Sequence, residues 1–399
     1  MRIAIVGGGI GGLTAALALL QRGYDVKVYE QAPELKELGA GVQISPNGSR
    51  ILFDLGLKDE IMALASEPEG KEVRLWNTGR TWKLFDLGPV SMEIYGFPYL
   101  TLHRNDLHKT LAEAFIKRCP DGLVLGHACT GVEETASEAV LSFEGGMTAT
   151  ADIVVGADGV HSVIRNCLFG DGDPSFTGIV AWRGVIPWAD VAPHMQRPVG
   201  TNWIGPGGHV IHYPLRRGEL MNYVSVVERD DWQVESWSTQ GTTEECLADY
   251  EGWHEDVRGL IRAVGTLNKW ALILRPPMEQ WSQGRVTLLG DACHPTLPFL
   301  AQGANMAIED GLVFARALEA HNEDHVRAFE AYEAARVERT AKIVRGSEGN
   351  IARFHNPALA SEAGAVDYVD AEWTREKITE RYDWLFRYDA LTVPLSSGA

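Results

Sequence analysis

The first twenty residues constrain the fold of this chain more than any other stretch. A short apolar run leads into a glycine cluster at 7–12, and a run of small and apolar helix formers follows. In the G-x-G-x-x-G spacing, Gly7 permits a tight turn, Gly9 a close approach of backbone to a pyrophosphate, and Gly12 close packing of helix on strand. The helix would direct free N–H groups and a partial positive charge at the phosphates. This pattern predicts the first strand, turn and helix of a dinucleotide-binding βαβ unit.

Two further segments support a nucleotide site. A second apolar strand ends at Glu30, about twenty residues after the turn, where a ribose-binding acid belongs. A later segment containing Gly41, Val42 and Gln43 combines two glycines, a short alternating strand and a Pro-Asn breaker. It predicts backbone that lies close to a ligand, with a plain β-turn as the alternative.

Size and charge restrict the class of protein. With 399 residues the chain is too long for one simple core, and this length favours two domains or one elaborated domain. The net charge of −18 argues against nucleic acid or an anionic membrane as a partner. Five scattered cysteines without a C-x-x-C pair fit a reducing compartment and offer no zinc site. Without a signal peptide or a membrane-length apolar run, we expect a cytoplasmic enzyme.

The alternation of strand-like and helix-like segments predicts an α/β fold. We expect a Rossmann-like nucleotide domain over residues 1–177, whose strands at 71–102 extend toward a second domain, and whose last part is residues 275–320. A mainly β domain is expected over 178–274, and helices over 321–399. Seven of the twelve tryptophans fall in the mainly β part, Trp237 among them, and they either fill its core or line a face. The C-terminal helices predict either packing or the surface of a homodimer.

Two acids and one arginine stand where a ligand would meet the sheet. Asp158 and Asp291 each follow an apolar strand and a glycine, and the carboxyl ends of strands are where α/β sheets bind ligands. Arg104 precedes a helix that we expect Asn105 or Asp106 to cap. That arginine is either solvated or a partner for a cofactor phosphate.

Taken together, these motifs resemble the class A flavoprotein monooxygenases, the single-component FAD-dependent aromatic hydroxylases of the para-hydroxybenzoate hydroxylase fold. The resemblance spans nearly the whole chain. Three segments look most like salicylate, 3-hydroxybenzoate and 6-hydroxynicotinate hydroxylases: 39–43, 213–216, and 290–295 continuing through 302–310.

This resemblance implies a noncovalently bound FAD. Glu30 would bind the adenosine ribose, Arg104 the FAD phosphate or ribityl region, and Asp291 the ribityl chain. Asp158 would serve FAD structure and transient docking of NAD(P)H. The flavin ring would meet backbone at Gly41 and Val42, and at Gly303, Ala304 and Asn305.

The resemblance also implies the chemistry. NAD(P)H reduces FAD, dioxygen adds to give a hydroperoxide on the flavin ring, and its distal oxygen attacks an electron-rich aromatic ring. A phenol reacts better when deprotonated, so a base is useful. His209 is the candidate base, on the same strand face as Tyr213, with a structural histidine as the alternative. His212 would point to the opposite face. Tyr213 either hydrogen-bonds the substrate or packs in the core.

The sequence departs from these relatives in the loop after His294. Pro298 and Phe299 occupy positions where 3-hydroxybenzoate hydroxylases place a glutamine and hydroxynicotinate hydroxylases a histidine. Phe299 predicts a more apolar wall, and Val42 and Gln43 are expected to form another part of the pocket. A salicylate-like hydroxybenzoate becomes the favoured substrate by elimination. The alternatives are 3-hydroxybenzoate 6-hydroxylase or 6-hydroxynicotinate 3-monooxygenase activity, a hydroxylase or epoxidase of a larger neutral molecule, and a flavin-binding redox sensor.

Overall fold

The glycine-rich start of the chain forms the centre of a six-stranded sheet, as predicted. β1 (Arg2–Val6) pairs in parallel with β2 (Asp25–Glu30) on one side and with β11 (Ile153–Gly156) on the other. The full order is β17-β18-β11-β1-β2-β7, in which β17 is antiparallel to its neighbour. The remaining strands of this sheet are β7 (Leu123–Leu125), β17 (Ser282–Gln283) and β18 (Val286–Leu288). The strand order brings both ends of the nucleotide-binding sequence into one sheet.

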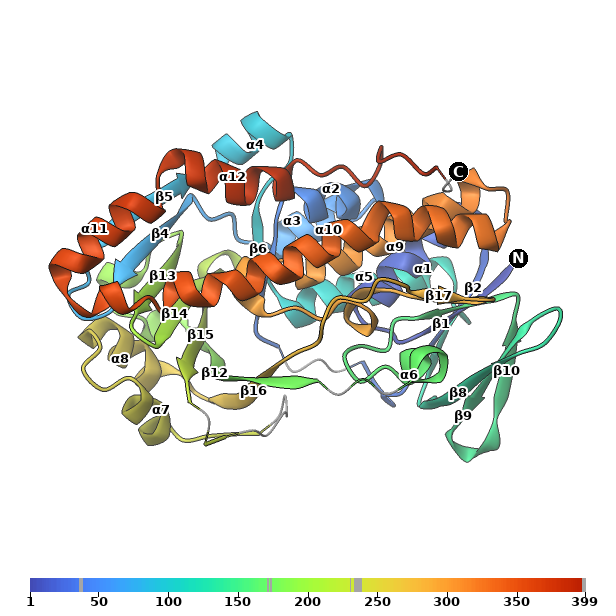
Figure 1. The fold of residues 1–399 in the computed structure, drawn as a ribbon, viewed down its shortest axis with the longest axis horizontal. Coiled ribbons are helices and arrows are strands. Elements are labelled where there is room, and N and C mark those ends of the chain that lie inside the picture. The colour runs from blue at the N-terminus through green and yellow to red at the C-terminus, as the bar shows by residue number, and fades with distance from the viewer. Residues whose placement is uncertain (36–38, 171, 173, 230, 233–238, 397–399) are drawn as a thin grey trace.

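The computed structural model describes residues 1–396 apart from 36–38, 171, 173, 230 and 233–238 (Figure 1). Trp237 therefore lies outside the described residues. The helices are α1 (Ile10–Gln21), α2 (Pro46–Asp54), α3 (Lys58–Leu64), α4 (Pro89–Tyr95), α5 (Arg104–Arg118), α6 (Val163–Phe169), α7 (Thr243–Asp249), α8 (Glu255–Ala263), α9 (Gly303–Ala320), α10 (His325–Phe354), α11 (Glu362–Glu372) and α12 (Arg375–Phe386).

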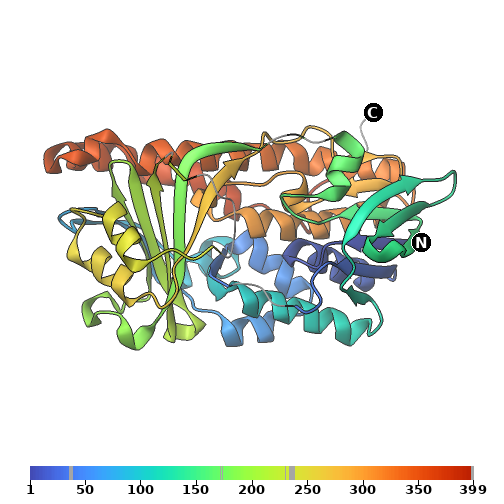
Figure 2. The same ribbon diagram turned by 90° about the horizontal axis from the view of Figure 1, so that it is seen from below.

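A seven-stranded sheet forms the other half of the molecule (Figure 2). Its order is β16-β12-β15-β14-β13-β4-β5, antiparallel except for the parallel pair β13–β4. Its strands are β4 (Gly70–Leu75), β5 (Thr81–Asp86), β12 (Ser175–Pro187), β13 (Val199–Gly205), β14 (Gly208–Leu215), β15 (Leu220–Glu228) and β16 (Asn268–Leu274). One face packs against α7 and α8 and the other against the end of α10 and α11. Two strands from residues 70–86 thus join those from the 178–274 region.

Two smaller sheets complete the strands. β3 (Gly41–Ile44) and β6 (Leu100–His103) form an antiparallel pair. A three-stranded sheet follows the order β10-β9-β8. Its members are β8 (Cys129–Glu134), β9 (Ala139–Phe143) and β10 (Thr148–Ala151).

Helix α10 connects the two large sheets along the length of the molecule (Figure 1). Its 30 residues span roughly 45 Å at the usual helical rise. Near one end, the hydroxyl of Tyr332 donates to the carbonyl of Leu288 in β18 (3.1 Å). At the other end, the ring of Phe354 contacts that of His209 in β14, with centroids 5.1 Å apart. This helix therefore fixes the position of one sheet relative to the other.

The prediction of strands throughout 71–102 was wrong at α4. Pro89 occupies the first turn, where its missing N–H is not needed, and Gly96 ends the helix in the left-handed region (φ +74°). Neither predicted cap begins α5: the helix starts at Arg104 and has no side-chain cap. The carboxylate of Asp106 instead accepts two hydrogen bonds from the guanidinium of Arg216 (2.7 Å each).

Three further properties concern the whole described chain. Within these residues no helix is long and apolar enough to cross a membrane. The five cysteines are free thiols. No cluster of histidine, cysteine and acidic side chains among the described residues could hold a metal ion.

Candidate active site

The turn between β1 and α1 leaves an open, positively polarised space. A Cβ atom added at Gly12 would lie 2.0 Å from the carbonyl oxygen of Gly7, so only glycine fits there. A Cβ atom at Gly9 would meet nothing within 4 Å. Helix α1 has no side-chain cap and no acid in its first turn, so its free N–H groups face that space. This arrangement fits the pyrophosphate of FAD.

Glu30 lies beside the same turn, at the end of β2. Its carboxylate accepts hydrogen bonds from the backbone N–H of Gly8 and of Ala32, each 2.8 Å long. A carboxylate has about four acceptor sites, so both oxygens can still accept from hydroxyl groups of a ribose.

Asp291 and Arg104 come together from distant parts of the chain. Asp291 is solvent-exposed, yet the surrounding protein raises the pKa of its carboxyl group, while the charges of His294 and Arg104 act in the opposite direction. An exposed carboxylate near a cation can accept hydrogen bonds from the hydroxyl groups of a ligand. Asp291 as acceptor and Arg104 as donor therefore fit a polyhydroxylated chain such as the ribityl of FAD.

Asp158 shapes the loop that leads into α6. Its carboxylate accepts hydrogen bonds from the hydroxyl of Ser162 and from the backbone N–H of Ile164 (3.1 Å). Burial raises the pKa of this carboxyl group, and those hydrogen bonds oppose the effect. The observed partners of Asp158 thus all belong to its own loop.

The start of α9 lies against β3. Asn305 holds the two together: its amide donates to the carbonyls of Gln43 (3.0 Å) and Ala301 (2.9 Å), and its oxygen accepts from the N–H of Ser45 (3.1 Å). Helix α9 begins at Gly303 without a side-chain cap and without an acid in its first turn. Its N–H groups at Gly303 and Ala304 fit a flavin ring that becomes negative on reduction.

The backbone of β3 also touches the larger sheet. The N–H of Gly41 donates to the side-chain oxygen of Asn222 (2.6 Å), and a Cβ atom at Gly41 would lie 2.6 Å from the ring of Tyr213. Val42 follows, partly buried. The buried side-chain nitrogen of Asn222 has no partner among the described residues. This unused amide N–H of Asn222 could donate to a cofactor bound beside β3.

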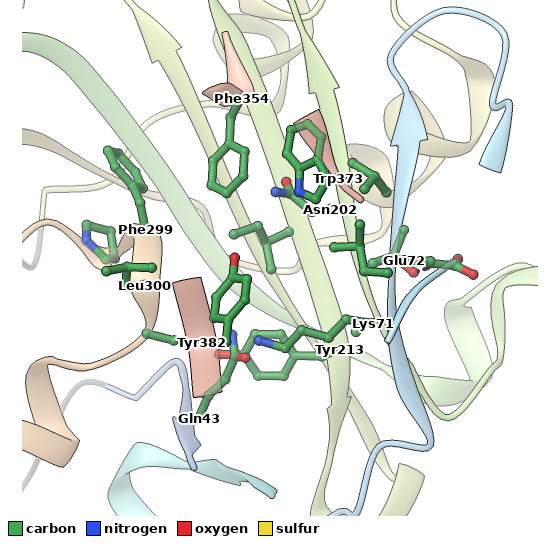
Figure 3. Close-up of a pocket in the computed structure, with 17 residues that line it drawn as sticks. Gln43, Lys71, Glu72, Asn202, Tyr213, Phe299, Leu300, Phe354, Trp373 and Tyr382 are labelled. Carbon is green, nitrogen blue, oxygen red and sulfur yellow. Dashed lines mark hydrogen bonds between the residues drawn. The ribbon is translucent and has the colours of Figure 1, made fainter. Parts of the chain in front are cut away.

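Next to these segments lies a cavity walled mainly by apolar and aromatic side chains (Figure 3). Strands β4, β5, β13 and β14 form one side, and the loop at 298–301 forms another. Phe354 of α10, Trp373 after α11 and Tyr382 of α12 complete the wall. Gln43 and Ala301 belong to this wall and are also the residues that Asn305 holds, so the cavity adjoins the expected flavin site.

Four of the five side chains predicted to contact substrate line the cavity: Gln43, Tyr213, Pro298 and Phe299. The hydroxyl of Tyr99 donates to Gln43 Oε1 (2.6 Å). Burial raises the pKa of Tyr213, and a hydrogen bond with Gln43 partly offsets that effect, so this phenol stays neutral.

His209 lies on the predicted face of β14 but does not line the cavity. Its ring is fully buried behind Phe299 and Phe354, with centroids 5.0 and 5.1 Å away. His212 points to the opposite face, where its Nε2 accepts from the indole N–H of Trp203 (3.2 Å). Burial lowers the pKa of His212 to about 3. The prediction of opposite faces was therefore right.

A hydrogen-bonded chain fixes the tautomer of His209. Glu228 Oε1 lies 2.7 Å from Nδ1 of His355, and Nε2 of His355 lies 2.7 Å from Nδ1 of His209. An ionised carboxylate only accepts, so His355 donates from Nδ1 and its Nε2 accepts from His209. Nε2 of His209 is left as an unprotonated acceptor without a partner among the described residues. Burial, together with His355, holds the pKa of His209 well below its usual value.

Several cavity residues were missed in the sequence. Lys71 and Asn202 come from β4 and β13. Phe354 and Tyr382 come from α10 and α12, and Trp373 comes from the turn between α11 and α12. The alternation around residue 71 indicated a strand but not which side chains would meet the cavity. The aromatic residues of the C-terminal helices were interpreted as packing, a dimer surface or, for the redox-sensor alternative, a partner surface.

Comparison with known proteins identifies the family of the chain. The FAD binding domain family matches residues 1–347. The chain is 39% identical over 394 residues to 3-amino-4-hydroxybenzoate 2-monooxygenase PtnB3 of Streptomyces platensis, covering 98% of this chain and 97% of the relative. It is 39% identical over 400 residues to 6-hydroxynicotinate 3-monooxygenase of Pseudomonas fluorescens, covering 99% and 96%.

A solved structure extends the likeness to the fold. Klebsiella pneumoniae HpxO, complexed with FAD and uric acid, superposes with a TM-score of 0.83 at 27% identity, covering 99% of this chain and 98% of that one. The predicted α/β fold, with a Rossmann-like FAD-binding part, is confirmed. The chain therefore belongs to the FAD binding domain family and is an FAD-dependent monooxygenase similar to the class A aromatic hydroxylases.

Proposed function

We propose that this enzyme hydroxylates a small phenolic aromatic acid, with NADH or NADPH as electron donor and dioxygen as oxidant. The observation that carries the proposal is the shared wall at Gln43 and Ala301. These residues line the aromatic cavity and are held by Asn305 at the start of α9, where we place the flavin ring. A ring in the cavity would thus lie next to the cofactor.

The relatives narrow the substrate class. Both names describe a ring acid that carries a hydroxyl group, 3-amino-4-hydroxybenzoate in one case and 6-hydroxynicotinate in the other. Salicylate-like acids fit the same description, and the apolar side chain of Phe299 suits them. We therefore keep all three kinds of acid as candidate substrates.

When bound, FAD supplies the transfer of electrons from the nicotinamide to dioxygen and of one oxygen atom to the ring. We assign the orientation of the substrate to Gln43 and Tyr213, and the acceptance of the phenolic proton to Nε2 of His209. Because Phe299 and Phe354 cover His209, the ring of Phe299 must turn aside for the phenol to reach it. The same two rings keep bulk water from the base.

We assign FAD binding to residues 1–177 and 275–320, and substrate binding to 178–274 with the strands of 71–102. Gly7, Gly9, Gly12 and Glu30 would hold the adenosine diphosphate part. We assign the nicotinamide cofactor transiently to the region of Asp158. The helices of 321–399 would close the substrate cavity.

The test is a substrate panel on purified protein. We expect a yellow protein whose NAD(P)H oxidation is stimulated by at least one hydroxylated ring acid, with oxygen uptake and a hydroxylated product. The panel contains 3-amino-4-hydroxybenzoate, 6-hydroxynicotinate, salicylate, 3-hydroxybenzoate and plain phenols. A protein that takes up no FAD, or that is stimulated by none of the acids, would contradict the proposal.

A further inference from the structure

A lysine side chain stands at the wall of the aromatic cavity. The side chain of Lys71, on β4, reaches toward Gln43 and Tyr382 (Figure 3). Its ammonium donates to the hydroxyl of Tyr99 (2.8 Å) and lies 4.7 Å from the centre of that ring. Tyr99 in turn donates to Gln43. The hydroxyl of Tyr99 satisfies one of three ammonium N–H groups.

The neighbouring acid does not neutralise this lysine. The carboxylate of Glu72 is engaged on the other side, where it accepts from Arg74, Arg197 and Thr201 at 2.9–3.0 Å. Within the part of the chain that the structure describes, no carboxylate lies within ion-pair distance of Lys71. A cation that protein surrounds is costly unless a partner arrives to pair with it.

An irregularity in the sheet sits at this position. Lys71 pairs with Phe85 and Glu72 with Lys83, so Leu84 of β5 has no opposite residue in the ladder. Such bulges redirect side chains and are frequent beside active sites. Leu84 and Lys71 both line the cavity, one as an apolar wall and the other as the charged group.

We propose that the ammonium of Lys71 binds the carboxylate of the aromatic substrate and thereby selects ring acids over neutral rings of the same shape. This inference rests on the proposed function and names the residue that sets its substrate class. It also explains how a chain with a net charge of −18 could bind an anion: the charge that matters is local.

The groups around Lys71 allow its protonation state to change when a ligand binds. The titratable groups facing it are the phenols of Tyr99, Tyr213 and Tyr382, and burial raises the pKa of each, so they stay neutral. Burial lowers the pKa of Lys71 to about 7. An arriving carboxylate favours the ammonium form and raises that pKa again. Binding of the anion above neutral pH should therefore take up a proton.

The experiment compares each acid with its amide. The pairs are salicylate and salicylamide, 3-hydroxybenzoate and 3-hydroxybenzamide, and 6-hydroxynicotinate and 6-hydroxynicotinamide. For the wild type we expect the KM of the preferred acid to be about 10- to 100-fold lower than that of its amide, as for a charge-assisted hydrogen bond. In Lys71→Met the ratio of the amide KM to the acid KM should fall to near one. In Lys71→Arg this ratio should lie between that of Lys71→Met and that of the wild type.

Two controls separate this role from a structural one. Lys83→Met removes the same charge from an exposed site on the adjacent strand β5 and should leave the ratio unchanged. Proton uptake on binding benzoate, which has no hydroxyl group to ionise, should reach about one proton per ligand near pH 8.5 in the wild type and vanish in Lys71→Met. FAD content reports whether each variant has folded.

The outcomes are distinguishable. If no ring acid stimulates wild-type NAD(P)H oxidation, the proposed function fails. If an acid does so but the amide-to-acid KM ratio and the proton uptake persist in Lys71→Met with its FAD retained, the role of Lys71 is overturned. If Lys71→Met loses FAD, the lysine inference is judged on Lys71→Arg, whose ratio must exceed one and whose proton uptake must disappear, because arginine stays charged.

Discussion

Replacement of His209 by alanine tests the proton-accepting role most directly. The change removes the unpartnered Nε2 and the Nδ1–H that His355 accepts, and it leaves the residues around the FAD cleft unaltered. We therefore expect His209→Ala to retain FAD and to keep oxidising NAD(P)H in the presence of a phenolic acid. Hydroxylated product per NAD(P)H should fall, and hydrogen peroxide should rise in its place.

The size and the pH dependence of the loss follow from the two pKa values involved. Burial and His355 hold the pKa of His209 well below its usual value, so the wild-type base is neutral across about pH 6 to 9 and coupling should be flat there. A base of low pKa does not ionise the phenol beforehand but accepts its proton as the ring is attacked; without it, only the phenolate that solvent produces can react, about 0.3% of a phenol of pKa near 10 at pH 7.5. Hydroxylation should drop by about 10²-fold, at the low end for loss of a general base, and recover about tenfold per pH unit.

The assay measures product, peroxide and NAD(P)H consumed across that pH range. His212→Ala is the matched control, because it removes a buried histidine from the opposite face of the same strand. A His209→Ala enzyme that retains FAD, couples as well as the wild type and has the same flat profile would refute the base role.

The remaining predictions concern the cofactor turn and the helix that joins the sheets. Gly9→Ala should weaken FAD binding while leaving the stability of the apoprotein unchanged. Gly12→Ala should lower both FAD affinity and apoprotein stability, because its Cβ would meet the carbonyl of Gly7. Fluorescence titration with FAD measures the affinity, and thermal unfolding measures the stability. Arg336→Met should destabilise the protein by about 3 kcal/mol in urea unfolding, the low end for a broken buried ion pair, since Glu309 and Asp310 each lose one partner but keep Arg339 and His294 respectively. The exposed Arg327→Met on the same helix should change little.

The parts of the site that the sequence predicted are those fixed by local pattern. The strand, turn and helix around Gly9 follow from spacing over a few residues, and so does strand β18, which ends three residues before Asp291. The helix at 89–95 was missed because its aromatic and apolar residues imitate strand alternation, and only Pro89 and Gly96 mark its ends. Where two periodicities fit a short segment, tertiary contacts decide between them.

The substrate cavity could not be predicted in the same way. Its wall joins Lys71, Asn202, Phe299 and Trp373 from four separate parts of the chain, and no spacing along the chain relates them. The family resemblance predicted that Phe299 and His209 belong to the site. It did not predict the ring of Phe354, which covers His209 from the far end of α10. A histidine that the sequence places beside a substrate is therefore found behind two aromatic rings.

Helix α10 shows why the C-terminal aromatic residues belong to the site. About a third of the way along α10, Arg336 pairs with Glu309 and Asp310 of α9 (2.6 and 2.7 Å), and Asp310 contacts His294 (2.6 Å). Burial opposes ionisation of Asp310, but His294 and Arg336 outweigh it and lower its pKa to about 2. The helix is thus anchored at the segment assigned to the flavin, while its last turn brings Phe354 and the following His355 to the cavity and the base. A shift of α10 would alter both at once, so the C-terminal helices set the distance between cofactor and substrate.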